Sequence, residues 1–355
     1  MTVVVLVVGA LALFVIGARA LLVGASLLAH ALRVSPLLIG LTVLPFATST
    51  PELIVSIDGA WAGQSELAIG NIVGTNTFNV LFILGLLALI ARLPVSSSVV
   101  RKEVPIMIGA SFLMWALSHD GHIGRVDGAV LLFAMVAHLK VLHLASVGGD
   151  SGRSHALREP AGIRGALPGI GLVILGGGLL ALSAQTVVDV AISAATDMGM
   201  SPHSMGLSFI AIGTSLPELA TTIVAVRRSE YDLAVGNVVG SNIFNVLTIL
   251  GVTALTSPEG VVVPPALIAF DVPVMIASAM ACYPMVRSGR VIDRREGAVL
   301  FGGYLAYGAY GWFYAAHHAP SFTQAMLFFA IPLLAATIAV SGRTGVAQPP
   351  PHPNR

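Results

Sequence analysis

The chain has 355 residues, of which 56% are hydrophobic and only 10% are charged. Soluble domains carry about 25% charged residues, so this composition predicts a polytopic membrane protein. The net charge of +1 gives no indication of a nucleic-acid partner. The single cysteine, Cys282, excludes an internal disulfide and a cysteine-based metal cluster.

Eleven apolar segments can be membrane-spanning helices, since a span needs about 20 apolar residues. They lie at 3–32, 36–60, 66–91, 103–118, 125–146, 165–196, 202–226, 231–256, 262–286, 295–316 and 322–341. No basic region precedes the first segment, so it is interpreted as a span and not as a signal peptide. With the N-terminus outside, 16 of the 18 basic residues fall on the inner side, which favours that orientation.

The sequence repeats itself at an offset of 166 residues. Residues 40–53 (GLTVLPFATSTPEL) match 206–219 (GLSFIAIGTSLPEL), and residues 67–89 match 233–255 at 16 of 23 positions. Each repeat has five spans, an odd number, so the second copy must enter the membrane from the opposite side. Such inverted repeats are common in transporters.

The predicted fold is an all-α polytopic membrane protein with a ten-span core of two inverted five-helix repeats and an eleventh C-terminal span. The expected divisions are a first repeat at 1–146, a cytoplasmic linker at 147–164, a second repeat at 165–316, an extra span within 317–341 and a disordered tail at 342–355.

Each repeat places one glutamate, Glu52 or Glu218, inside an apolar segment. A buried carboxylate in a membrane is costly unless a partner neutralises it. Pro51 and Pro217 precede the glutamates, and each proline deprives a carbonyl four residues earlier of its helical partner. Pro45 predicts a second break in the first copy only. Two broken helices with buried carboxylates predict a cation site.

Neutral oxygens accompany both glutamates. Hydroxyl groups lie one turn before each glutamate, at Thr48, Ser49, Thr214 and Ser215. The neighbouring spans each carry a hydroxyl and an amide four residues apart, which share one helical face; these pairs are Thr75 with Asn79 and Ser241 with Asn245. The other asparagines of these spans fall on other faces and are expected to cap broken backbone; they are Asn71, Asn76, Asn237 and Asn242.

Charge and ligand chemistry restrict the cation. Two carboxylates match one divalent cation, or two to three monovalent ones assisted by neutral oxygens. Calcium accepts six to eight oxygens in flexible geometry, whereas magnesium loses its water reluctantly. Zinc or copper would favour His or Cys, which the motifs lack.

The blocks G-T-S-x-P-E and G-N-x-x-G-[ST]-N-x-F-N, present in both halves, resemble the calcium/cation antiporter superfamily and are most similar to the prokaryotic sodium/calcium exchangers. The resemblance covers the ten-span core and implies exchange of sodium for calcium by alternating access. It implies calcium binding by Glu52, Glu218, Thr48 and Thr214. It implies sodium binding by Ser49, Ser215, Thr75, Ser241, Asn79, Asn245, the carbonyls of Pro45 and Ala211, and both glutamates.

The chain departs from the superfamily pattern in two places. Ala47 replaces the usual glycine of the first G-T-S block. Potassium-dependent relatives have an aspartate where this chain has Asn79 or Asn245, which argues against potassium coupling. Proton/calcium exchangers usually carry G-N-x-x-E where this chain has T-S-x-P-E. The absence of that pattern favours sodium as the counter-ion.

Other functions remain as alternatives. These are a proton-coupled calcium/cation antiporter, a cation channel, and an intramembrane hydrolase, for which no Ser–His pair or HExxH motif is found. The expected protein is a transporter and not an enzyme, without a cofactor, in the inner (plasma) membrane of a prokaryote. Its expected partners are the lipid bilayer and the calcium and sodium ions, and its oligomeric state is left open.

Overall fold

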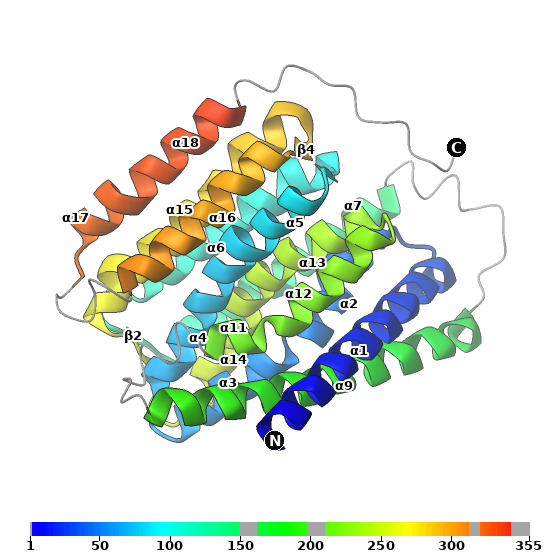
Figure 1. Ribbon diagram of the computed structural model, residues 1–355, viewed down its shortest axis with the longest axis horizontal. Coiled ribbons are helices and arrows are strands. Elements are labelled where there is room, and N and C mark those ends of the chain that lie inside the picture. The colour runs from blue at the N-terminus through cyan, green and yellow to red at the C-terminus, as the bar shows by residue number, and fades with distance from the viewer. Residues whose placement is uncertain (1, 149–161, 198–209, 312–319, 342–355) are drawn as a thin grey trace.

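The computed structural model describes residues 2–148, 162–197, 210–311 and 320–341, and nearly all of this part of the chain is helical (Figure 1). The first half contains α1 (Thr2–Leu32), α2 (Pro36–Thr48), α3 (Thr50–Trp61), α4 (Ser65–Thr77), the π-helix η1 (Phe78–Leu84), α5 (Gly85–Ile90), β1 (Leu93–Pro94), the π-helix η2 (Val99–Glu103), α6 (Val104–Leu117), β2 (His122–Ile123) and α7 (Arg125–Gly148).

The rest of the chain follows the same order of elements. It contains α9 (Gly162–Asp197), α11 (Ala211–Thr214), α12 (Leu216–Arg227), α13 (Tyr231–Phe244), the π-helix η4 (Asn245–Ile249), α14 (Leu250–Thr256), β3 (Val261–Val262), the π-helix η5 (Leu267–Asp271), α15 (Val272–Gly289), β4 (Val291–Ile292) and α16 (Arg294–Tyr310). The final helices are α17 (Phe322–Gln324), the π-helix η7 (Ala325–Ala330) and α18 (Ile331–Ser341).

Seven helices in the described part are long and apolar enough to cross a membrane, or eight if the bent pair α2 and α3 is counted as one span. The predicted segments 103–118 and 295–316, which correspond to α6 and α16, are not among them. Segment 202–226 begins outside the described residues. Most of the predicted linker and all of the predicted tail also lie outside them. Eleven spans therefore remain a prediction.

The helix breaks lie where the prolines predict them. Helices α2 and α3 meet at Ser49 with a bend of 45°, and α11 and α12 meet at Ser215. Pro51 and Pro217 lie in the first turn of the helix after each break, where a missing N–H costs nothing.

The second break predicted at Pro45 is wrong. Pro45 lies inside α2, and the helix continues to Thr48. Its ring fits beside Gly240 of α13, where an added Cβ would come within 2.7 Å of the proline Cγ. Close packing against this glycine stabilises α2 although a backbone donor is missing.

Two small antiparallel sheets join the two halves, and the sequence analysis did not predict them. Strand β1 pairs with β4, with Leu93 opposite Ile292, and β2 pairs with β3, with His122 opposite Val262. Each sheet therefore connects a loop of one half with a loop of the other.

The spans that contain α4 and α13 form the centre of the molecule, and most of their residues are buried. Helix α13 packs closely against α2, and α4 packs against α3. Helices α1 and α9 lie side by side at one edge of the molecule (Figure 1) and pack against α2 and α12. Their crossing depends on glycine, because a Cβ on Gly176 would come within 2.4 Å of the Leu21 nitrogen.

The last helix lies on the opposite edge (Figure 1), packed against α15 and α16. The Ser341 hydroxyl donates a hydrogen bond of 2.7 Å to the buried carboxylate of Glu296 on α16. An aromatic cluster formed by Phe270, Tyr310 and Phe329 packs η7 against η5 and α16. The eleventh predicted segment is therefore bound to the helical core.

Candidate cation site

Glu52 and Glu218 lie in the first turn of α3 and α12, directly after the two helix breaks. Both side chains are fully buried. The positive end of a helix dipole favours a carboxylate at this position. The negative charge of Glu218 acts on Glu52, so the fold brings the two predicted carboxylates into one site.

The two glutamates have different hydrogen-bond partners. Oε1 of Glu218 accepts a hydrogen bond of 2.9 Å from the Ser49 hydroxyl and one of 3.4 Å from Ser241. Oε2 of Glu218 and both carboxylate oxygens of Glu52 have no hydrogen-bond partner in the described part of the chain. Buried charges normally have partners, so these three oxygens are suited to a cation.

The two threonines of the repeated motif face the opposite half of the chain. Thr48 donates to Oδ1 of Asn237 at 3.3 Å, and Thr214 donates to Oδ1 of Asn71 at 3.1 Å. Thr214 also lies beside the carboxylate of Glu52. The two asparagines were expected to cap broken backbone; instead they accept hydrogen bonds from threonine hydroxyls, and this expectation is corrected.

Ser215 and Thr75 meet at the carbonyl of Ala211. Ser215 donates to this carbonyl at 2.6 Å and to the Thr75 hydroxyl at 3.2 Å. Thr75 in turn lies 3.5 Å from the same carbonyl oxygen. In the other half, the carbonyl of Pro45 accepts the backbone N–H of Ser49 at 2.9 Å. Carbonyl oxygens have two lone pairs, so the Pro45 carbonyl can still contact an ion, whereas the Ala211 carbonyl already accepts both the backbone N–H and the hydroxyl of Ser215.

Four asparagines form a reciprocal network between the central spans. Asn79 donates to Oδ1 of Asn242 at 3.1 Å, and Asn245 donates to Oδ1 of Asn76 at 3.0 Å. Asn76 and Asn242 also donate to each other's backbone carbonyls. The network uses the amide nitrogens of Asn79 and Asn245, and their Oδ1 atoms have no hydrogen-bond partner among the residues that the structure describes. Both oxygens are therefore available as neutral ligands.

The sequence analysis missed the bridging role of Asn76 and Asn242, which were also expected to cap broken backbone. Asn76 and Asn242 lie three residues before Asn79 and Asn245, a spacing at which helical side chains are neighbours, but each orients the amide of the opposite half. That spacing was the available signal, but the bond partners come from the other half of the chain.

A cavity of about 610 Å³ reaches the site from one end of the molecule. Its walls come mainly from α3 and α9, and they include Pro51, next to Glu52, and Thr214. Two acidic side chains, Asp58 and Asp189, also line it. Negative charge along an access path concentrates cations. Glu66, which was considered together with Asp58 as an attractor of cations, does not line this cavity.

The site contains two acidic residues and otherwise neutral oxygen donors. Nowhere in residues 2–148, 162–197, 210–311 and 320–341 do three His, Cys, Asp or Glu side chains gather in a metal-binding group. Such a donor set suits a hard cation that is bound and released, because zinc and copper prefer nitrogen or sulfur ligands.

The sodium/calcium exchanger protein family matches residues 2–142 and 168–313. The chain therefore belongs to this family of membrane transporters and is not an enzyme. The inner membrane protein YrbG of Escherichia coli K12 is 38% identical over 314 residues, which cover 85% of this chain and 94% of YrbG.

Two further relatives are antiporters by name. The putative antiporter CaxA of Alkalimonas amylolytica is 35% identical, and the match covers 80% of this chain and 90% of CaxA. The sodium/calcium exchanger MaX1 of Methanosarcina acetivorans is 28% identical and covered to 91%, also over 80% of this chain. A structure of the sodium-calcium exchanger NCX_Mj matches with a TM-score of 0.74 at 24% identity, over 87% of this chain and 98% of that one. The two proteins share a fold.

Proposed function

We propose that this protein exchanges sodium for calcium across the membrane by alternating access and extrudes calcium. The main support is the pair of fully buried glutamates, of which three carboxylate oxygens have no protein partner within the described residues. One calcium ion or two sodium ions would neutralise the two charges, and a third sodium ion would be held by neutral oxygens. The name of MaX1 and the family description support the choice of ions.

In this proposal calcium occupies the centre and sodium occupies the centre and its flanks. The calcium ligands are Glu52, Glu218, Thr48 and Thr214. The sodium ligands are Ser49, Ser215, Thr75, Ser241, Asn79, Asn245, the carbonyls of Pro45 and Ala211, and both glutamates. The free Oδ1 atoms of Asn79 and Asn245 support their place in this set.

Competition for the glutamates couples the two ions. Either load neutralises the buried charge, whereas an empty site keeps two carboxylates that are costly to desolvate. Neutralisation then lets α1 and α9 slide across the site as a pair. The contacts of α1 with α2 and α12, and of α9 with α3 and α11, support this role.

The proposed topology is a ten-span core of two inverted repeats with the N-terminus outside. The reciprocal bonds between the halves support a two-fold relation, because Thr48 contacts Asn237 as Thr214 contacts Asn71. In this orientation the cavity with Asp58 opens outward.

The test is uptake of radioactive calcium into proteoliposomes loaded with sodium, in sodium-free medium. We expect uptake that requires internal sodium and that stops when sodium is equal on both sides. Internal potassium and an imposed pH gradient serve as controls. Equal uptake under the pH gradient would replace sodium with protons as the counter-ion, and uptake without any gradient of a second ion would indicate a channel.

A further inference from the structure

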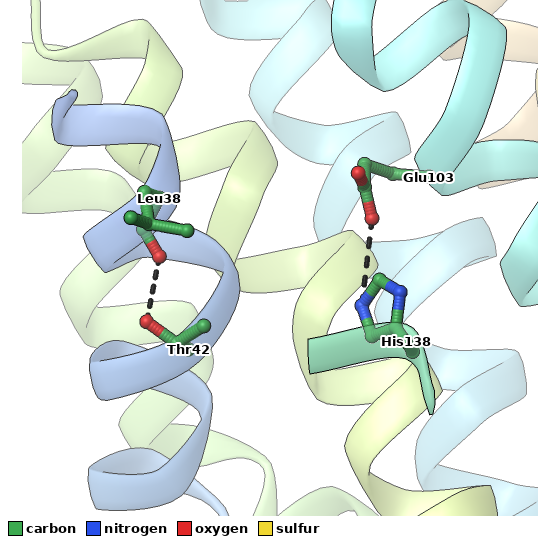
Figure 2. Close-up of polar contacts among 4 residues, drawn as sticks. All are labelled: Leu38, Thr42, Glu103 and His138. Carbon is green, nitrogen blue, oxygen red and sulfur yellow. Dashed lines mark hydrogen bonds and ion pairs between the residues drawn. The ribbon is translucent and has the colours of Figure 1, made fainter. Parts of the chain in front are cut away.

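One of the buried acidic residues outside the cation site faces a histidine. Glu103, the last residue of η2, is 1% exposed, and His138 on α7 is 6% exposed. Nε2 of His138 lies 3.5 Å from Oε2 of Glu103, and Figure 2 shows the carboxylate pointing at the imidazole ring. In the described part of the chain, Oε2 of Glu103 and Nδ1 of His138 have no hydrogen-bond partner. Neither residue is among the proposed calcium or sodium ligands.

The other half of the chain has an equivalent acidic residue. Glu103-Val-Pro in the first half corresponds to Asp271-Val-Pro in the second. Both acidic residues are the last residue of a π-helix, and η2 and η5 differ by 168 residues at both ends.

The partner of each acidic residue is equivalent as well. Residues 127–131 (DGAVL) near the start of α7 match residues 296–300 (EGAVL) near the start of α16, an offset of 169. At this offset the residue that corresponds to His138 is Tyr307. The Tyr307 hydroxyl donates to Oδ1 of Asp271 at 2.7 Å. Each half therefore pairs an acidic residue with a ring from the second α-helix that follows it, α7 or α16. Of the two rings, only that of the first half is a histidine, which titrates near neutral pH.

The surroundings of the pair supply little other charge. Helix α7 packs mainly against α6, α14, η4 and β2; the first three carry no ionisable side chain, and β2 carries His122. Segment η2 also packs against α13 and α15. The ionisable residues of these neighbours and of the flanking chain are Arg101, Lys102, Arg125, Asp127, Lys140, His143, Tyr231, Asp232, Cys282, Tyr283 and Arg287. Lys102, which acts on Glu103, is exposed.

We propose that Glu103 and His138 form a proton-binding site, separate from the cation site, whose occupancy sets the maximal rate of exchange. With one proton the pair is electrically neutral. Loss of that proton leaves a buried carboxylate, and a second proton leaves a buried imidazolium opposite a neutral acid; both states are costly. The pair therefore favours the packed arrangement only while it holds one proton.

The route from this pair to the cation site is short. Segment η4 contacts both α6 and α7, and its first residue is Asn245. A change in the packing of α6 and α7 therefore acts on the segment that presents a proposed sodium ligand. This link to transport depends on the proposed function, whereas proton binding by the pair does not.

Proton binding is tested by NMR of the full-length protein with labelled histidine, titrated from pH 5 to 9. The His138 signal is identified by its loss in His138→Gln. In Glu103→Gln we expect the midpoint of the His138 titration to move to lower pH, because the carboxylate stabilises the imidazolium. Half-protonation of His138 should then require at least a tenfold higher proton concentration. An unchanged titration in Glu103→Gln would overturn the proposal, whether or not the protein exchanges sodium for calcium.

The link to transport is tested by flux at saturating calcium across the same pH range. We expect a wild-type maximal rate that falls at least threefold on both sides of an optimum, and a flatter profile in His138→Tyr, which copies the pair of the second half. His138→Gln serves as the second variant and Tyr307→Phe as the matched control. If protons instead compete with calcium for Glu52 and Glu218, pH would change the half-saturating calcium concentration. That pH effect would remain in both His138 variants. Wild-type pH profiles of the maximal rate in both variants would contradict the link.

Discussion

The two halves of the cation site come from one repeated motif but hold their glutamates differently. Glu218 accepts hydrogen bonds from Ser49 and Ser241, whereas both oxygens of Glu52 have no partner in the described residues. Ser215, the counterpart of Ser49, donates to the Ala211 carbonyl and to Thr75 instead. Two similar copies of one motif thus give a carboxylate held by hydrogen bonds, Glu218, and one without such partners among the described residues, Glu52.

This difference follows the position of the cavity. The cavity reaches Pro51 and Thr214, which both neighbour Glu52. The free carboxylate is therefore the one nearer the access path, where an arriving cation can meet it. Glu218 stays oriented by its two hydroxyl donors. We infer that Glu52 makes the first contact with the ion and that Glu218 completes the site.

The largest expected effect comes from removing either carboxylate. Glu52→Gln and Glu218→Gln should each reduce sodium-driven calcium uptake by about 100-fold or more, because one remaining charge cannot neutralise a divalent ion in a buried site. Proteoliposome flux measures this. Glu66→Gln, at an exposed glutamate of α4, should leave uptake unchanged, and substantial uptake in either site variant would refute the shared site.

A smaller effect is expected from the asparagine network. Asn76→Ala removes two hydrogen bonds and Asn242→Ala removes the two equivalent ones and a contact with the Met107 sulfur, at about 0.5–1.5 kcal/mol per bond, and each variant releases the amide that the asparagine orients. The half-saturating sodium concentration should rise by about tenfold in both variants. Thr42→Val is the control, because that hydroxyl bonds only the Leu38 carbonyl of its own helix, at 2.6 Å (Figure 2). Unchanged sodium dependence would show that amide orientation is unimportant.

The serine pair tests the comparison itself. Ser49→Ala removes a hydrogen bond to a charged oxygen, worth about 1.5–3 kcal/mol. The single O–H of Ser215 donates only to neutral oxygens, so Ser215→Ala removes about 0.5–1.5 kcal/mol. The half-saturating calcium concentration should therefore rise by about tenfold in Ser49→Ala and by about threefold in Ser215→Ala. Equal effects, or the reverse order, would mean that the two glutamates are held alike.

The smallest effect belongs to the cavity. Asp58→Asn and Asp189→Asn should slow calcium uptake by about two- to threefold at low ionic strength, because the local attraction for cations falls. The difference should disappear near 1 M salt, where charges are screened within about 3 Å. A loss that persists in high salt would instead make one of these residues an ion ligand.

The sequence predicted the parts of the fold that depend on local chemistry. The breaks before Pro51 and Pro217 follow from a missing donor, and the burial of Glu52 and Glu218 follows from their apolar surroundings. Pro45 misled the prediction, because its tolerance within α2 depends on Gly240 of another helix.

The missed features all depend on contacts between distant segments. The strand pairs β1–β4 and β2–β3 join loops of different halves. Asn76 and Asn242 serve as bridges only because each meets the other. Glu103 and His138 come from separate helices, and no spacing in the sequence relates them. Helical periodicity reports on one segment at a time, so it cannot indicate such pairs.

The central claim is that Glu52 and Glu218 together bind one calcium ion that sodium displaces. Equilibrium binding of radioactive calcium to the purified protein tests it most directly. The account predicts one calcium per chain, displacement by sodium with a steeper than linear concentration dependence, and loss of binding in Glu52→Gln and in Glu218→Gln. Calcium binding at wild-type affinity in either single variant would contradict it.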